Sequence, residues 1–317
     1  MSSWAVVTKM VIILYAGSGF LFSGLFGCLM NVIIFSSFHM YRSQPCTFYL
    51  LIAALTRFTH LLMIGILRGI AILFNVDLTL ISLEWCKMRF HIVSTCFGLE
   101  MTFECLATID RFLITSRKVY IRQLSNIKMA HRVTAGLIAV WILQNIPYLI
   151  FVKINSNICA IYNDFWQLYS TYVNRWVLYT AVPLIVCIVF GILAHGNMRS
   201  LKRSRQLQKA DRQLFYMIFG QMIVTVLPVI PSAVFDVYSP SAISVKQAAE
   251  KDINYFAFNL LNVLCVLCYG STFFIFIIVS SIFRSRFRQR FSCCSRHRNL
   301  VTTVTMHRFV AEASPRR

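Results

Sequence analysis

Charged residues, and acidic ones above all, are scarce in this sequence. Asp and Glu together number 11 in 317 residues, and charged residues of both signs make up 13% of the chain, about half the share that is usual in soluble globular proteins. Internal repeats, low-complexity tracts and a separate soluble domain are also lacking. Hydrophobic residues make up 58% of the chain, and the mean hydropathy is +0.67. This balance excludes a soluble protein and indicates an integral membrane protein.

Seven apolar runs are long enough to cross the hydrocarbon layer, which takes about 20 residues of helix. The alternating pattern of short segments that a membrane β-barrel needs is missing, and a helix satisfies its backbone hydrogen bonds internally, as lipid demands. We therefore predict an all-α membrane protein, a seven-transmembrane helix bundle. The predicted spans are 11–37, 47–74, 86–115, 131–152, 172–198, 212–238 and 254–282.

Catalytic and transport motifs are missing as well. The predicted spans hold no His-rich or paired-Asp motif and no nucleophile with partners, so we expect no enzyme, no metal and no cofactor. A transporter would show repeated halves with helix breaks at matching positions, and none is visible. The net charge of +20 could suggest nucleic acid. However, the basic residues are spread over short segments beside the span ends, where the anionic lipid of the bilayer is the better partner.

The two sides of the predicted bundle differ in basic residues. Of the 31 Lys and Arg, 21 fall in one set of alternate segments that ends with the tail, 6 in the opposite set and 4 within spans. Lys and Arg are retained on the cytoplasmic side. We therefore predict that the amino terminus lies outside and the carboxyl tail inside.

The eleven cysteines divide by their place relative to the membrane. Cys86 and Cys159 alone face the predicted outside, where an oxidising environment permits a disulfide, and we predict that they are bonded. Cys293 and Cys294 follow the last span on the reducing side. There we expect acylation, with two ordinary free thiols as the alternative.

Several motifs together resemble those of the rhodopsin-like (class A) G-protein-coupled receptors. They are a cysteine at the outer end of the third span, Asp-Arg-Phe at its inner end, Trp141 in the fourth, Pro183 in the fifth and Pro231 in the sixth. The spacing from Cys86 to Arg111 is the most specific match, and the resemblance extends over essentially the whole chain. Within the family, the sequence looks most similar to divergent invertebrate receptors that are often grouped with neuropeptide receptors.

The resemblance implies a multi-pass receptor of the plasma membrane, with an extracellular ligand and a heterotrimeric G protein as partners. It also implies a receptor domain over 1–292 and a cytoplasmic tail over 293–317. No other domain is expected.

The Asp-Arg-Phe motif, Asp110, Arg111 and Phe112, has a defined role in the family that this chain resembles. Its arginine is held by acidic neighbours in the off state and faces the G protein in the on state. Asp110 is one such neighbour, and Asp211, near the start of the sixth span, is the second candidate. Alternatively, Asp211 only complements the dipole of its helix.

A short amphipathic eighth helix is predicted after the seventh span. Phe283, Phe287 and Phe291 recur every four residues, with arginines between them. This spacing indicates an interfacial helix with its aromatic stripe against lipid and its arginines at the headgroups.

The sequence also departs from the family pattern. Thr272 to Phe276, Thr-Phe-Phe-Ile-Phe, stand where the family has Asn-Pro-x-x-Tyr, and the sixth span has no tryptophan. Arg57 aligns with the near-universal aspartate of the second span. These changes leave a second interpretation open, namely a non-signalling or atypical receptor such as a scavenger or a heteromer partner.

Two classes of ligand can be excluded from the sequence. The seventh span has no lysine, which excludes a retinal Schiff base of the usual opsin kind, and Val93 stands where amine receptors carry an aspartate. Five outward-half residues are candidates for ligand binding, although each could equally reach the interface or pair internally. Three of them are basic, which favours a ligand with an acidic group or carbonyls, such as a short peptide. The five are Arg68, Arg89, His91, Asp236 and Tyr255.

The charges in the third span form one stripe. At 100° per residue, Glu104 lies about 40° and Arg111 about 20° from Glu100 around the helix. Charges within a membrane face the bundle interior, so the stripe should point inward, with Arg57 as its partner. We hypothesise that Arg57 replaces the sodium ion that related receptors bind, and that Glu100, alone or with Glu104, neutralises it. Alternatively, one glutamate is simply protonated, because burial disfavours its charged form.

Overall fold

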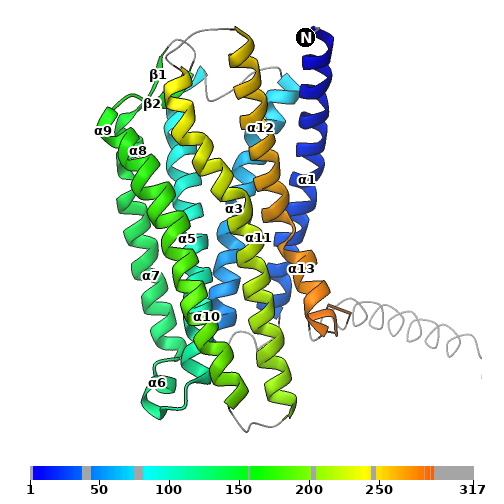
Figure 1. Ribbon diagram of the computed structural model, residues 1–317, viewed down its shortest axis with the longest axis vertical. Helices are drawn as coiled ribbons and strands as arrows, with labels where there is room; N and C mark the ends of the chain where they lie inside the picture. The colour runs from blue at the N-terminus through cyan, green and yellow to red at the C-terminus, as the bar shows by residue number, and fades with distance from the viewer. Residues whose placement is uncertain are drawn as a thin grey trace, which may run out of the picture.

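The structure, a computed structural model, is an elongated bundle of helices (Figure 1). It describes residues 3–37, 44–74, 81–155, 158–200, 205–243, 248–281, 283–285 and 287–288. Within these ranges, six helices are long and apolar enough to cross a membrane, and a bent pair makes seven if it counts as one span. The long helices are α1 (Ser3–Ser37), α3 (Pro45–Phe74), α5 (Leu83–Thr115), α7 (Ile127–Gln144), α10 (Val182–Ser200), α11 (Arg205–Ile243) and α12 (Ala248–Gly270).

Shorter elements connect or extend the long helices. The π-helix η1 (Tyr169–Ala181) runs directly into α10, and α13 (Thr272–Val279) follows α12 after one residue. A two-stranded antiparallel hairpin, with Val152 opposite Ile161, lies between α8 and α9. The other short elements are α6 (Val119–Gln123), α8 (Ile146–Phe151), β1 (Val152–Asn155), β2 (Ile158–Ile161) and α9 (Asp164–Leu168).

The predicted fold class, a helical bundle of membrane-spanning length, is confirmed. Helix α5 is the centre of the bundle, because 61% of its apolar stretch is buried, against 22% for the span formed by α7 and α8. Large apolar side chains such as Phe22 and Ile192 remain exposed on the outer surface. Lipid would cover them in a membrane.

Two of the predicted spans are interrupted. The fourth breaks at Asn145, between α7 and α8. The Asn145 side chain donates to the carbonyl of Trp141 at 2.9 Å. The seventh, predicted as one helix over 254–282, is instead bent by 40° at Ser271. At this bend Gly270 lies against Gly24 of α1, since a Cβ built on Gly270 would lie 2.7 Å from the Gly24 Cα. The absent side chains let the two backbones touch.

The eighth helix differs from its prediction. Residues 283–285 and 287–288 are helical, but Phe283 is buried rather than turned to lipid. Its ring lies 5.9 Å from that of Phe35 and 5.7 Å from that of Phe276, centroid to centroid. The prediction of a lipid-facing stripe is wrong here, because the end of the bundle offers an aromatic pocket that buries Phe283. Phe291 lies outside the described residues.

Gly98 of α5 lies directly against the indole ring of Trp141. A Cβ at Gly98 would lie 2.5 Å from the indole ring, and the indole is fixed by its Nε1, which donates to Thr102 at 3.0 Å. We therefore expect Gly98→Ala to destabilise the fold by about 1–3 kcal/mol, measured as a lower thermal midpoint in detergent. Gly136→Ala is the matched control, because nothing lies within 4 Å of its Cβ. Equal midpoints for both variants would contradict this packing.

Candidate functional site

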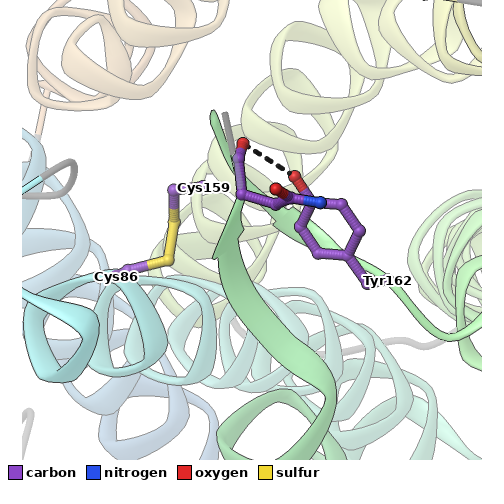
Figure 2. Close-up of a disulfide and its surroundings, with 4 residues drawn as sticks. Cys86, Cys159 and Tyr162 are labelled. Carbon is purple, nitrogen blue, oxygen red and sulfur yellow. Dashed lines mark hydrogen bonds between the residues drawn. A yellow bond between two sulfur atoms is a disulfide. The ribbon is translucent and has the colours of Figure 1, made fainter. Parts of the chain in front are cut away.

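A disulfide and a hairpin lie at one end of the bundle, which we call the disulfide end. Cys86, in the first turn of α5, is bonded to Cys159 of β2, with 6.0 Å between their Cα atoms, as predicted from the sequence. Figure 2 shows this bond beside the hairpin. The amino-terminal end of α1 lies at the same end of the bundle (Figure 1).

The hairpin is held in place by its own contacts as well as by the disulfide. The Tyr162 hydroxyl donates to the carbonyl of Asn155 at 3.1 Å (Figure 2). Val152 packs with Cys86 in an apolar cluster that includes Tyr148 and Trp166. The hairpin is thus bonded to the start of α5 and packed against it.

The structure gives a partial view of the five candidate ligand residues. Arg89 and His91 are both on α5, where Arg89 is exposed and His91 is half-buried. Two residues apart, they point to opposite sides of a helix. His91 Nδ1 lies 3.0 Å from the carbonyl oxygen of Asn145, so the imidazole has a partner within the bundle. The other three candidates, Arg68, Asp236 and Tyr255, belong to α3, α11 and α12, but their side chains lie outside the described residues.

A group of four buried polar side chains lies in the middle of the bundle. We call it the Arg57 cluster, and it consists of Arg57 from α3, Glu100 and Glu104 from α5, and Gln221 from α11. Arg57 donates to Glu100 Oε1 from Nε at 2.8 Å and from Nη2 at 2.7 Å. The same Nη2 donates to Glu104 Oε1 at 2.5 Å, and Gln221 Nε2 donates to that oxygen as well.

Local sequence explains why these groups meet. Glu100 and Glu104, four residues apart, lie on one face of α5, and both face Arg57. Arg111, the third member of the predicted stripe, is paired with Asp110 instead. Sequence reasoning missed Gln221, although a glutamine in the apolar run Phe-Gly-Gln-Met-Ile-Val was a usable signal. The cluster connects three helices by side-chain hydrogen bonds in the least exposed part of the chain, since none of the four residues is more than 2% exposed.

The opposite end of α5, which we call the Arg111 end, carries the Asp-Arg-Phe motif. Arg111 Nη2 lies 3.3 Å from Asp110 Oδ2, and both side chains are buried. Asp110 Oδ1 also accepts from the Ser125 hydroxyl at 2.5 Å. Phe112 packs edge to face on Phe190 of α10. Asp211 belongs to α11, but its side chain lies outside the described residues.

A small cavity lies beside Arg111. Its volume of about 10 Å³ is enough for one water molecule. It lies between α5, α10 and α11, and its lining residues are Thr108, Arg111, Cys187, Phe215, Ile218, Phe219 and Met222.

Two hydrogen bonds connect α11 to the end of α13 near this cavity. Gln213 Nε2 donates to the Ser281 hydroxyl at 2.7 Å, and the Ser280 hydroxyl donates to Gln213 Oε1 at 3.3 Å. Both bonds would break if this end of α11 moved away from the end of α13.

The remaining predicted residues lie outside the described chain. Cys293 and Cys294, and the rest of the tail over 293–317, are among them. Within the described ranges, no group of His, Cys, Asp and Glu is arranged to hold a metal ion.

Comparison with known proteins yields one distant similarity. No protein-family model matches the chain. A Caenorhabditis elegans protein described as a probable G-protein coupled receptor is 26% identical over 144 residues, which is 42% of this chain and 31% of that protein. The similarity thus spans about a third of the relative's length and favours a receptor over an enzyme. The chain is a helical, multi-pass membrane protein with distant, partial homology to a probable G-protein-coupled receptor.

Proposed function

We propose that the chain is a plasma-membrane receptor that binds an extracellular ligand and activates a heterotrimeric G protein. The observation that carries this proposal is the buried Asp110–Arg111 pair at the end of α5 opposite the disulfide. A guanidinium that is paired inside a bundle and borders a cavity is suited to a two-state role. It can stay paired in one state and be released to a partner in the other.

The contacts that hold the inner end of α11 are weak enough to allow this helix to move. This helix lines the cavity beside Arg111, and Gln213 connects its inner end to Ser280 and Ser281. Breaking these two neutral hydrogen bonds costs about 1 kcal/mol each. Such a cost is small enough for ligand binding to overcome.

The ligand side of the proposal rests on the predicted residues Arg68, Arg89, His91, Asp236 and Tyr255. Their basic members favour a short peptide or another ligand with an acidic group. In the proposed orientation the disulfide end faces outward, and the hairpin lies on that side, bonded to the start of α5. Acylation of Cys293 or Cys294, at the inner side, belongs to the same proposal.

A second candidate function is an atypical receptor that binds a ligand without signalling. Phe276 supports it, because this residue stands where the receptor family has a tyrosine. Its ring is 2% exposed and packs against Phe35 and Phe283. It therefore fixes α13 by apolar contact and offers no hydroxyl to a polar rearrangement.

Removal of the Arg111 guanidinium tests the first candidate. We expect Arg111→Ala to reduce basal or extract-stimulated G-protein activation about tenfold or more, since a charge-assisted hydrogen bond contributes roughly 1.5–3 kcal/mol. Surface expression should stay near that of the wild type, because Asp110 lies at the end of α5 and keeps the hydrogen bond from the Ser125 hydroxyl. The measurement is nucleotide exchange on G proteins in cells that express each variant in equal amounts at the surface.

Lys87→Ala is the matched control for this experiment, because it removes a cation from the other end of the same helix. It should leave G-protein activation unchanged. Equal activation by the wild type and Arg111→Ala would contradict the Arg111 mechanism, and activation no higher than in cells without the chain would favour the non-signalling candidate.

A further inference from the structure

The Arg57 cluster is short of positive charge. One guanidinium faces two carboxyl groups, Glu100 and Glu104, within 2.5–2.7 Å. If all three are ionised, the cluster carries a net charge of −1 at a place where all three side chains are at most 2% exposed. An uncompensated charge in such an interior is strongly disfavoured.

Among the described residues, no titratable neighbour of the cluster supplies the missing positive charge. Thiols and phenols add no positive charge, and a charged imidazole on α3 would be repelled by Arg57. The titratable groups that face the cluster from the surrounding helices are Cys28 of α1, His60 of α3, Cys96 and Cys105 of α5, Cys187 of α10 and Tyr269 of α12.

The cluster also has more hydrogen-bond acceptors than donors. Glu100 Oε2, Glu104 Oε2 and Gln221 Oε1 are buried, and no donor of the described chain bonds to them. Gln221 is itself 2% exposed and already bound to Glu104 through its amide nitrogen. All three unpaired atoms are acceptors, and buried acceptors are normally paired.

We infer that the Arg57 cluster binds one proton on its pair of carboxyl groups. The proton cancels the excess negative charge and converts one unpaired acceptor into a donor. Glu104 is the better host, because Glu100 Oε1 receives two bonds from the guanidinium, whereas Glu104 Oε1 receives one from the guanidinium and one from a neutral amide. The inference does not rest on the proposed receptor function.

A metal cation fits this place less well than a proton. It would lie beside the guanidinium, which would repel it, and the described residues offer no group of His, Cys, Asp and Glu that could hold a metal ion. A proton needs no additional ligands and no additional space. The site therefore suits a proton better than a metal cation.

A bound proton makes stability depend on pH in a defined direction. The unfolded chain exposes both glutamates, which are ionised at neutral pH, so the native state holds one proton more. Stability then falls as pH rises, and the unfolding equilibrium constant increases about tenfold per pH unit. It falls because unfolding releases the proton, and this release is more favourable at higher pH, where the proton concentration is lower.

The experiment measures unfolding in detergent at several pH values around neutrality. Glutamine mimics a protonated glutamate, so Glu104→Gln and Glu100→Gln should each lower the pH dependence by about one proton relative to the wild type. Gln221→Leu removes the α11 contact without a change in charge and should keep the wild-type slope. Glu84→Gln, at an exposed position of the same helix, should keep it too. An identical slope for the wild type and both cluster variants would overturn the inference.

A second measurement needs no substitution. The chain has five glutamates, Glu84, Glu100, Glu104, Glu250 and Glu312, so wild-type protein made with carboxyl-labelled glutamate gives an interpretable infrared spectrum. We expect the carbonyl absorption of a protonated glutamate to persist at neutral pH, where exposed glutamates are ionised. Its absence would overturn the inference even if both cluster variants failed to fold.

Discussion

Replacement of Arg57 with alanine should remove most of the folded protein from the cell surface. The variant leaves two carboxyl groups in the bundle interior without the guanidinium that donates to both of them, and only Gln221 still donates to Glu104. Loss of one partner from a buried ion pair costs about 3–5 kcal/mol, which is a large share of the roughly 5–15 kcal/mol that stabilises a typical fold. Surface expression and the thermal midpoint in detergent would measure the loss, and Glu100→Ala should show it as well.

Two further variants separate the charge from simple packing. Leu62→Ala, at an exposed position of the same helix α3, should have little effect. The triple variant Arg57→Met, Glu100→Gln, Glu104→Gln should recover much of the loss, because neutral groups avoid an unpaired buried charge. Sodium concentration should not alter basal signalling or ligand binding beyond its ionic strength. Wild-type expression of Arg57→Ala would refute the role of the cluster in stability.

Loss of the disulfide should have an effect of similar size. The bond joins residues 73 positions apart, and the chain-entropy relation gives about 4 kcal/mol for a loop of that length. Cys86→Ser should therefore lower the thermal midpoint strongly. It should also release the hairpin from the start of α5.

Reducing agent provides an internal control for this prediction. It should lower the midpoint of the wild type to that of Cys86→Ser and leave the variant unchanged. Peptide mapping of unreduced, surface-expressed protein should show the Cys86 and Cys159 peptides linked. Two free thiols in such protein would end the prediction.

The features that could be predicted from the sequence are those that the bilayer or the cost of a buried charge imposes on the chain. The spans follow from apolar runs, which must be helical in a membrane. The inward direction of Glu100 and Glu104 follows from their cost on any other face. The disulfide follows from the two cysteines that share the predicted outer side.

The features that were missed depend on tertiary contacts or on short local signals. The break at Asn145 has such a signal, since Pro147 two residues later cannot donate to the preceding turn. The hairpin has one as well, because β-branched residues, Val152 and Ile154 before Asn155 and Ile158 and Ile161 after it, favour strands. Phe283 has none, because its amphipathic spacing is the same whether lipid or Phe35 covers it. Gln221 could be noticed in the sequence, but only the fold shows that it reaches Glu104.

We expect the Arg57 cluster to act during membrane insertion as well, because its members are synthesised one after another. Arg57 leaves the ribosome 43 residues before Glu100, so α3 is complete before its countercharge exists. An unpaired arginine near the centre of a helix disfavours insertion by about 2.5–3.5 kcal/mol on biological insertion scales. If α3 and α5 enter the bilayer as one hairpin, the guanidinium meets its carboxylates before it meets lipid. We therefore expect the second span to insert stably only together with the third. A chain whose synthesis is stalled between the two spans should leave α3 poorly inserted.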